Sequence, residues 1–380
     1  MTALRAGTAD FDRKEEGPLW IRVDISVILL SIALLAMGLV VVYSATRGVL
    51  REDDLPDRSF LDRQIVFIVV GLVAGGITAA VDYRKARALV PVIYVGSVVL
   101  LVAVLLFGTE RNGARSWFST GFADFQPSEF AKPVMILALA AWFSTVQSRE
   151  RLEFVNVMIG LGIAGLLSGL VLLQPDFGTV MVYGAIVAGI VIVAGVSVRH
   201  VVVVLGLLVA AVWAMVAGGF LRQTQLNRFT AFADPESVSR YNVNQAEIAI
   251  GNGGMTGTGL FQGTQNNSSL VPEKETDFIF SVVGEELGFV GGATLLVLFG
   301  FLLMRIWRIA HLAENDFGRL IAVGVFCMFL FQAFQSVGMN MGMMPVTGIP
   351  LPLISAGGSS MITNLICLGL VQNVHAHRLR

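Results

Sequence analysis

The stretch that decides the fold is residues 27–42, VILLSIALLAMGLVVV, which contains no charged residue. Four more apolar blocks of similar length follow within the first 220 residues, at 65–81, 155–173, 180–196 and 201–219. A helix needs roughly 20 mainly apolar residues to cross the ~30 Å hydrocarbon core of a membrane. Because each block approaches that length, the sequence predicts several transmembrane helices.

The composition of the whole chain supports a membrane protein. Of the 380 residues, 55% are hydrophobic and only 14% are charged, whereas soluble domains carry about 25% charged residues. The 26 basic and 27 acidic residues nearly balance, so no basic field indicates nucleic acid as a partner. The two cysteines, Cys327 and Cys367, each lie in an apolar run, which excludes a disulfide framework as the basis of the fold.

We therefore predict an all-α polytopic membrane protein with about ten transmembrane helices. A polar tail of residues 1–22, without a signal-peptide pattern, precedes a transmembrane domain at 23–375 and a short tail at 376–380. The domain contains one large loop, residues 222–277. The predicted spans are 23–45, 63–81, 89–107, 130–146, 154–173, 179–196, 201–221, 278–304, 319–338 and 359–374.

The distribution of Lys and Arg predicts the orientation. With both termini in the cytoplasm, 15 of the 26 basic residues fall in the inner segments. These segments total about 60 residues, against about 120 in the outer ones, so the basic density differs roughly threefold. The positive-inside rule therefore favours an N-in/C-in topology, which places the large loop 222–277 on the outer face.

Two groups of polar residues follow the third span. In the first group, Arg115 and Trp117 are typical of snorkelling and interfacial anchoring, although they can also serve a site. In the second group, Glu129 and Lys132 are three residues apart, so they share one face of the fourth helix and can pair. Such a pair either only neutralises itself or tunes a site at the mouth of a cavity.

Carboxylates near two further outer helix ends are also candidates. Asp176 lies in a turn where it can cap the next helix. Asp277 stands where the large outer loop enters the eighth span, and Glu285 lies about 12 Å deeper on that helix, next to Glu286. Ionisable residues at membrane depth mark function by default, so we expect a site at the outer face.

The loops on the outer side carry their own signals. The glycine-rich segment 251–259 lacks the spacing of a nucleotide cradle, so flexibility or close packing explains it better. Residues 242–250 place Val243, Ala246 and Ile250 on one face of a short helix, which we expect on the membrane surface, and the glycines up to Gly263 then give hinge freedom. The proline-rich segment 344–360 cannot form a single helix.

Taken together, these segments resemble the bacterial SEDS family (shape, elongation, division and sporulation) of peptidoglycan glycosyltransferases. The resemblance covers residues 23–375 and is greatest to the elongation members, with the division members as the nearest alternative. It rests on five blocks in order: GARSWF at 113–118, QPSEFAK at 126–132, QPDFGT at 174–179, TDFIFSVVGEELG at 276–288 and PVTGIPLPLISAGGSS at 345–360.

The resemblance implies an activity and its setting. A SEDS-type bundle in the bacterial cytoplasmic membrane would polymerise lipid II, the undecaprenyl-pyrophosphate-linked disaccharide peptide, at the outer face. It would work with a class B penicillin-binding protein and the elongation machinery. The characteristic acidic residue of the family maps onto Asp277, and its Trp, Glu and Lys map onto Trp117, Glu129 and Lys132.

The chemistry of glycosyl transfer assigns roles to these residues. Asp277 is the candidate general base for the acceptor hydroxyl. Lys132 and Arg115 are candidates to stabilise the pyrophosphate that leaves, with a divalent cation such as Mg or Mn as a further possibility. No motif fixes a metal site. Asp176, Glu285 and Ser355 complete the set of candidate substrate-binding or electrostatic residues.

Two departures from the family pattern stand at the predicted site. The family often has His where this chain has Glu275, and Tyr where it has Ala356. A lipid II flippase and a passive scaffold for the penicillin-binding protein are the alternatives from other classes. The polar residues cluster near outer helix ends rather than along a transport path, which is evidence against the flippase. A scaffold function does not explain why Asp277, Glu285 and Glu286 are present.

Overall fold

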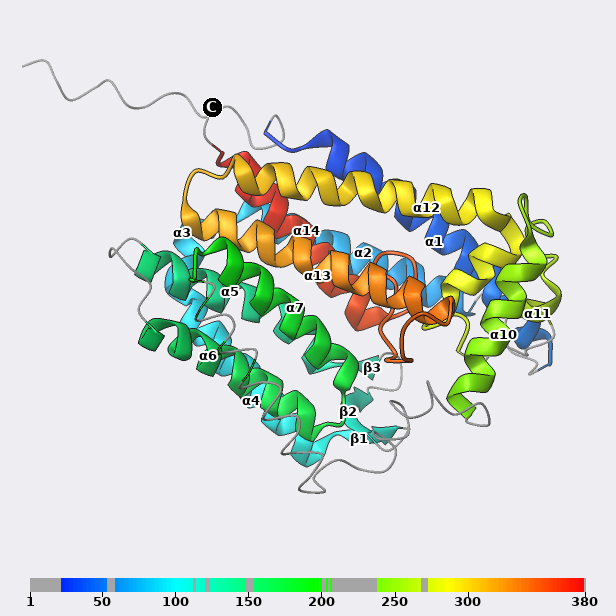
Figure 1. Cartoon of the computed structure of the whole chain (residues 1–380), viewed down its shortest axis with the longest axis horizontal. Coiled ribbons are helices and arrows are strands. Elements are labelled where there is room, and N and C mark those ends of the chain that lie inside the picture. The colour runs from blue at the N-terminus through cyan, green and yellow to red at the C-terminus, as the bar shows by residue number, and fades with distance from the viewer. Residues whose placement is uncertain are drawn as a thin grey trace, which may run out of the picture.

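The computed structural model describes residues 22–52, 59–111, 114–119, 124–147, 154–197, 238–267 and 273–378, together with positions 199, 203 and 206. In these ranges the chain is a bundle of long helices (Figure 1), and nine of the ten predicted spans coincide with a helix. These are α1 (Ile25–Glu52), α2 (Ser59–Ala80), α4 (Val90–Phe107), α5 (Pro127–Gln147), α6 (Phe154–Leu173), α7 (Phe177–Val193), α12 (Ile279–His311), α13 (Asp316–Asn340) and α14 (Gly358–Ala376). The predicted span 201–221 lies outside the described residues apart from positions 203 and 206.

The predicted all-α membrane class is confirmed. Seven of the described helices are long and apolar enough to cross a membrane, and α7 is a shorter apolar helix. Helix α14 has a lower mean hydropathy because its buried face carries amide side chains, among them Asn364, Gln372 and Asn373. Its buried position depends on polar contacts as well as on apolar packing.

A small sheet between α4 and α5 was not predicted. Its strands β1 (Thr109–Arg111), β2 (Ala114–Ser119) and β3 (Asp124–Phe125) pair antiparallel in the order β1-β2-β3. The strands are too short for a reliable alternation pattern, but they fix the residues that enter α5.

The bundle has two chemically different ends. The sheet, α10 (Val238–Gly253) and α11 (Thr264–Asn267) gather at one end, which we name the outer end (Figure 1). Helix α3 (Tyr83–Ala86), the 3₁₀ turn Arg87–Leu89, the start of α1 and the end of α14 lie at the other, the inner end (Figure 1). Both described termini thus lie at one end, as an even number of spans requires. The side of the membrane that each end faces stays a prediction.

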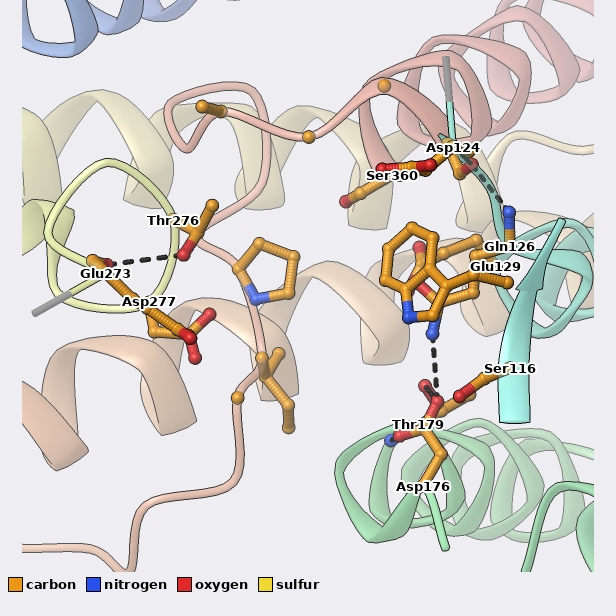
Figure 2. A pocket seen from close by; sticks show the side chains of 18 of the residues that line it. Ser116, Asp124, Gln126, Glu129, Asp176, Thr179, Glu273, Thr276, Asp277 and Ser360 are labelled. Carbon is orange, nitrogen blue, oxygen red and sulfur yellow. Dashed lines mark hydrogen bonds between the residues drawn. The ribbon is translucent and has the colours of Figure 1, made fainter. Parts of the chain in front are cut away.

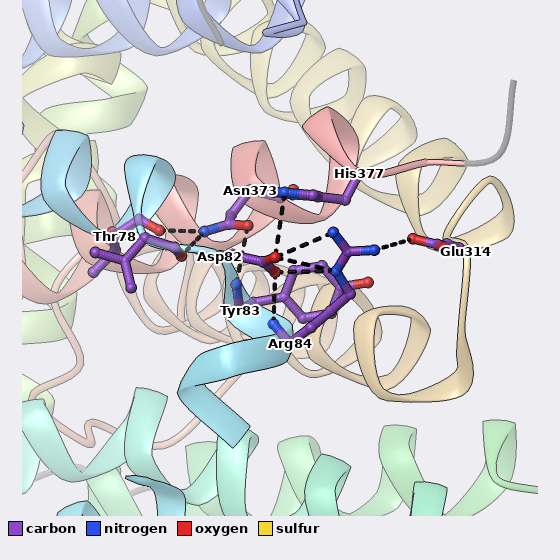
Figure 3. A network of polar contacts seen from close by, with 8 residues as sticks. Thr78, Asp82, Tyr83, Arg84, Glu314, Asn373 and His377 are labelled. Carbon is purple, nitrogen blue, oxygen red and sulfur yellow. Dashed lines mark hydrogen bonds and ion pairs between the residues drawn. The ribbon is translucent and has the colours of Figure 1, made fainter. Parts of the chain in front are cut away.

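A polar network closes the inner end (Figure 3). Asp82 caps α3 by accepting a hydrogen bond from the backbone N–H of Arg84 at 2.9 Å. The Arg84 guanidinium contacts Asp82 at 3.1 Å and Glu314, between α12 and α13, at 3.0 Å. His377, just after α14, stands 3.8 Å from the Asp82 carboxylate. The network therefore connects the α2–α3 corner with the α12–α13 loop and the end of α14.

Helix α12 is broken near its start, and another segment completes it. Gly288 has φ +66° and ψ −163°, which interrupts the helical hydrogen bonds. The chain after α10 supplies replacements: Thr258 N–H donates to the Glu285 carbonyl, and Phe289 N–H donates to the Gly254 carbonyl, both at 2.9 Å. Residues 254–259 are thus held by the backbone of α12.

The predicted short helix at 242–250 is confirmed as part of α10. Its apolar face, including Val243 and Ala246, is buried, and α10 packs against α12 rather than only lying on the membrane surface. At Gly253 an added Cβ would stand 1.9 Å from the Gly284 carbonyl oxygen. Of the two explanations for the glycine-rich segment, close packing therefore holds at Gly253, while the predicted hinge freedom stays a prediction.

Candidate functional site

A cavity of about 610 Å³ lies at the outer end of the bundle. Residues from α2, β2, α5, α7, α14 and the loops before α12 and α14 line it. Figure 2 shows Glu273, Thr276 and Asp277 on one side of the cavity, with Glu129 and Asp176 on the other. The charged residues of the lining are Arg63, Asp124, Glu129, Lys132, Asp176, Glu273, Glu275 and Asp277. The sequence placed four of these, Glu129, Lys132, Asp176 and Asp277, among its candidates.

Asp277 is held at the cavity by its own backbone. It immediately precedes Phe278, the N-cap of α12. Its N–H donates to the Glu273 carbonyl at 3.0 Å, and its carbonyl accepts from the Asn340 side chain at the end of α13, also at 3.0 Å. An added Cβ at Gly348, which has φ +71°, would stand 3.4 Å from Asp277 Oδ2. The contacts to Glu273 and Asn340 thus hold the Asp277 backbone, and Gly348 leaves room beside its carboxylate.

Ser355 fixes the segment before Asp277 rather than lining the cavity. Its side chain is buried, accepts a hydrogen bond from Leu351 N–H at 2.9 Å and donates to the Thr276 carbonyl at 2.6 Å. Next to it, Ala356 N–H donates to the Glu275 carbonyl at 2.8 Å. The proline-rich loop is non-helical as predicted, and these contacts bind it to the loop that carries Asp277.

The predicted pairing of Glu129 with Lys132 is confirmed. Lys132 Nζ stands 2.5 Å from Glu129 Oε1, and the two side chains are only 2% and 5% exposed. Both residues line the cavity, so the pair is not a solvent-exposed surface ion pair. A buried ion pair is retained at a cost in desolvation, so a role in the cavity stays a prediction that this position supports.

Asp176 both caps a helix and lines the cavity. Its Oδ1 accepts the N–H of Thr179, which caps α7 as predicted. Its Oδ2 accepts hydrogen bonds from Gln126 Nε2 at 3.1 Å, from Ser128 Oγ at 3.3 Å and from Thr179 Oγ1 at 2.8 Å. Asp176 therefore connects the starts of α5 and α7 on the wall opposite Asp277 (Figure 2).

The two candidate site residues of β2 lie in different surroundings. Trp117 lines the cavity. Arg115 is exposed and does not line it, and its guanidinium stands 3.5 Å from Glu110 of β1. In a β-strand, residues two apart point to the same face, but a β-bulge between Thr109 and Glu110 makes the register of this short pair irregular. Arg115 is therefore outside the cavity in this structure.

Glu285 also lies away from the cavity. It is fully buried, and its Oε1 accepts hydrogen bonds from Gln265 N–H at 2.7 Å and Thr264 Oγ1 at 3.2 Å. Glu286 similarly accepts from Ser44 of α1 and from Phe261 N–H. These two carboxylates hold the segment after α10, so their contacts are those of positioning residues rather than of substrate ligands.

The sequence reasoning missed two polar residues of α2. Arg63 lines the cavity and adds a second cation to Lys132. Gln64 is buried, donates to the Ser355 carbonyl at 3.2 Å and accepts from Gly357 N–H at 3.4 Å. In the sequence, Arg63 and Gln64 are a polar pair at the edge of a predicted span. Polar residues at this position are typical of any membrane helix end.

The described side chains do not form an evident metal site. Among the described residues, no group of three or more His, Cys, Asp or Glu side chains is placed to hold a metal ion. The carboxylates of the cavity lie on opposite sides of it (Figure 2).

The fold and the cavity define a helical membrane protein with a mainly acidic outer cavity that contains a buried lysine. Residues 25–380 match the family described as "Cell cycle protein", FtsW/RodA/SpoVE. The chain belongs to this family, which is the SEDS family expected from the sequence.

Similar proteins cover nearly the whole chain. The peptidoglycan glycosyltransferase MrdB of Escherichia coli is 34% identical over 362 residues, covering 94% of this chain and 95% of that protein. The rod shape determining protein RodA of Thermus thermophilus matches in structure with a TM-score of 0.72 at 33% identity, covering 96% of this chain and 100% of that chain. A chain from a peptidoglycan synthase complex that coordinates polymerisation and crosslinking matches with a TM-score of 0.80 at 34% identity, covering 95% and 100%.

Proposed function

We propose that this chain is a peptidoglycan glycosyltransferase that polymerises lipid II at the outer face of the bacterial cytoplasmic membrane. The observation that carries the proposal is the cavity, in which a carboxylate stands across from a buried lysine. The named activity of the similar E. coli protein supports the same reaction class. An outer cavity matches a substrate whose sugar and pyrophosphate lie at the membrane surface.

The geometry supports a reaction in which one wall of the cavity activates the acceptor and the opposite wall stabilises the leaving group. Asp277 would accept the proton of the acceptor 4-hydroxyl as its oxygen attacks the anomeric carbon, a contribution typically worth about 10²–10⁴-fold in rate. The bond to the pyrophosphate breaks, and its developing negative charge needs donors on the other side of the cavity. Lys132, paired with Glu129, is the cation on that side, and Arg63 is a second cation in the cavity lining. Trp117 offers an aromatic face to a sugar ring.

The elongation role is favoured over the division role. Similarity to a rod shape determining protein supports synthesis for cell elongation, although the same family includes FtsW. For partners, the similar chain comes from a complex that coordinates polymerisation with crosslinking. This supports a class B penicillin-binding protein of the elongation machinery as the partner of this chain.

The test is polymerisation by purified protein. We expect the chain in detergent to convert fluorescent lipid II into glycan strands resolved by gel electrophoresis, faster when the class B penicillin-binding protein is added. A parallel assay follows fluorescent lipid II across vesicle bilayers that contain the chain. Transfer across the bilayer without polymer in the first assay would favour a flippase instead. Adding EDTA, Mg²⁺ or Mn²⁺ to the first assay decides whether a divalent cation takes part.

A further inference from the structure

The buried polar atoms that have no hydrogen-bond partner within the described part of the chain include five that belong to α5, α13 and α14. They are Glu129 Oε2, both amide atoms of Gln332, Thr363 Oγ1 and Asn364 Oδ1. None of these four residues is more than 4% exposed. Buried polar groups are almost always hydrogen-bonded, and an unpaired one is especially costly at membrane depth. Ordered water is the usual partner of such buried groups.

Two of these residues lie at one level of the bundle. The start of α5 and the end of α13 are both close to residues that line the cavity. The two helices therefore run antiparallel. They touch where an added Cβ at Gly324 would stand 2.7 Å from Ile136. From this contact, Gln332 lies about 12 Å towards the cavity along α13, and Glu129 about 10.5 Å along α5. Gln332 is therefore level with Glu129.

Helix α14 brings Thr363 and Asn364 to the same level. At the start of this helix, Ser359 Oγ accepts the N–H of Gln126, the residue before α5, at 2.9 Å. From that contact, Thr363 and Asn364 lie about 6 and 7.5 Å down α14, between the depths of Glu129 and Lys132 on α5. Helices α5, α13 and α14 all pack against one another.

We propose that Glu129, Lys132, Gln332, Thr363 and Asn364 form a polar layer that binds ordered water beneath the cavity. A buried water makes about three hydrogen bonds to groups of this kind. The layer is continuous with the cavity because Glu129 and Lys132 line it, and because Ser360, which also lines it, accepts from Asn364 Nδ2 at 3.4 Å.

The layer has a consequence for catalysis, which rests on the proposed function. Lys132 has three donors and Glu129 two acceptor oxygens, so their mutual contact leaves capacity that water can fill. Water held by Gln332 and Asn364 would keep the pair fixed in the cavity. Gln332 and Asn364 are then positioning residues for the cation that faces the leaving pyrophosphate.

The first experiment measures hydration without lipid II. X-ray radiolysis in H₂¹⁸O converts bound water to hydroxyl radicals, which label adjacent side chains. Cys367 is fully buried and lies one helical turn after Thr363 and Asn364 on α14, so we expect it to be labelled in the wild-type chain. The label should fall several-fold in Gln332→Met, which replaces the amide with an apolar group of similar length.

Gln372→Met is the matched control. Gln372 is also buried, but both of its amide atoms bond to the backbone of Asp24, at 2.8 and 3.0 Å. No water is needed there, so its replacement should leave the labelling of Cys367 unchanged. An unlabelled Cys367 in the folded wild-type chain would overturn the hydrated layer.

The second experiment measures polymerisation. We expect Gln332→Met to lower kcat about tenfold with little change in KM, because binding contacts remain and only the cation is misplaced. Gln332→Asn keeps an amide and should restore most of kcat, whereas Gln372→Met should leave it unchanged. A normal kcat in Gln332→Met overturns the positioning role. If the wild-type chain makes no polymer, the proposed function fails, while the labelling of Cys367 still decides whether the layer is hydrated.

Discussion

Asp277 is the single side chain on which the proposed reaction depends most. Asn has nearly the same shape as Asp but is a far poorer proton acceptor, so Asp277→Asn should lower the polymerisation rate by at least about 100-fold. The backbone contacts to Glu273 and Asn340 do not involve the carboxylate, and the variant should therefore fold and bind the partner normally. Polymerisation at the wild-type rate by a folded Asn variant would remove Asp277 from the mechanism.

Glu275 and Ala356 are the two departures from the family pattern, and the structure places them in contact. Ala356 N–H donates to the Glu275 carbonyl, and both residues line the cavity. We therefore expect the two positions to be coupled. Ala356→Tyr alone should lower kcat/KM because the ring enters the cavity next to Glu275, and Glu275→His should partly restore it. Residues in contact typically show interaction free energies of about 0.5–3 kcal/mol.

The measurement is a double-mutant cycle on kcat/KM with lipid II. It needs the two single variants, the double variant and the wild-type chain, all checked for folding. If the free-energy changes add within about 0.5 kcal/mol, the two departures are independent, and their contact carries no functional information.

At the level of elements, the helices and the main candidates could be predicted, and the reasons are local. An apolar block of membrane length specifies a helix wherever it lies in the bundle. The three-residue spacing of Glu129 and Lys132 specifies a shared helix face, and the capping position of Asp176 follows from the turn before α7. Each of these features depends only on residues near it in the sequence, so it can be predicted without knowing how the helices pack.

The features that the sequence did not reveal depend on contacts between distant segments. Glu285 has the spacing of a site residue, but whether its helix face meets the cavity or residues 264–265 depends on how the chain after α10 packs. Arg63 is indistinguishable from an interfacial anchor until α2 lies beside the cavity. The sheet β1–β3 and the alignment of Gln332 with Glu129 are likewise set by tertiary packing.

The contact between α10 and α12 makes a sharp test of packing. An added Cβ at Gly253 would stand 1.9 Å from the Gly284 carbonyl, whereas at Gly251, in the same helix, it meets nothing within 4 Å. Gly253→Ala should therefore lower the free energy of unfolding by about 1–3 kcal/mol through overpacking. It should also reduce polymerisation because Asp277 lies just before the N-cap of α12.

Gly251→Ala is the matched control for this prediction. Alanine favours a helix over glycine by about 1 kcal/mol, so this variant should be as stable as the wild-type chain or slightly more so. Thermal unfolding in detergent, with activity measured on the folded fraction, gives the comparison. Equal stability of the two variants would mean that α10 does not pack closely on α12.

Across the whole molecule, the proposed chemistry and the polar closure of the bundle lie at opposite ends. The cavity and the segments that hold Asp277 are at the outer end, and the network around Asp82 is at the inner end (Figures 1 and 3). The helices between them are about 25–50 Å long from their residue numbers. A change at the inner end should therefore act on stability without altering the reaction.

Asp82→Ala tests this separation. Loss of the α3 cap and of the contacts to Arg84 and His377 should lower the free energy of unfolding at pH 7 by about 1–2 kcal/mol. Polymerisation per folded molecule should stay at the wild-type level. Asp316→Ala, which removes an exposed partner of Arg319 at the same end, should have a smaller effect on stability.

The same network predicts how the effect of Asp82→Ala depends on pH. Burial raises the pKa of Asp82, but hydrogen bonds from the Arg84 side chain and backbone lower it more, so its pKa lies below the ordinary 3.8. A lowered pKa stabilises the folded chain above the ordinary value, and the contribution disappears as the pH falls through the folded-state pKa. The difference in Tm between the wild-type chain and Asp82→Ala should therefore be constant near neutral pH and narrow below pH 3.8. A difference that instead widens on acidification would show that the carboxylate does not stabilise the inner end through its charge.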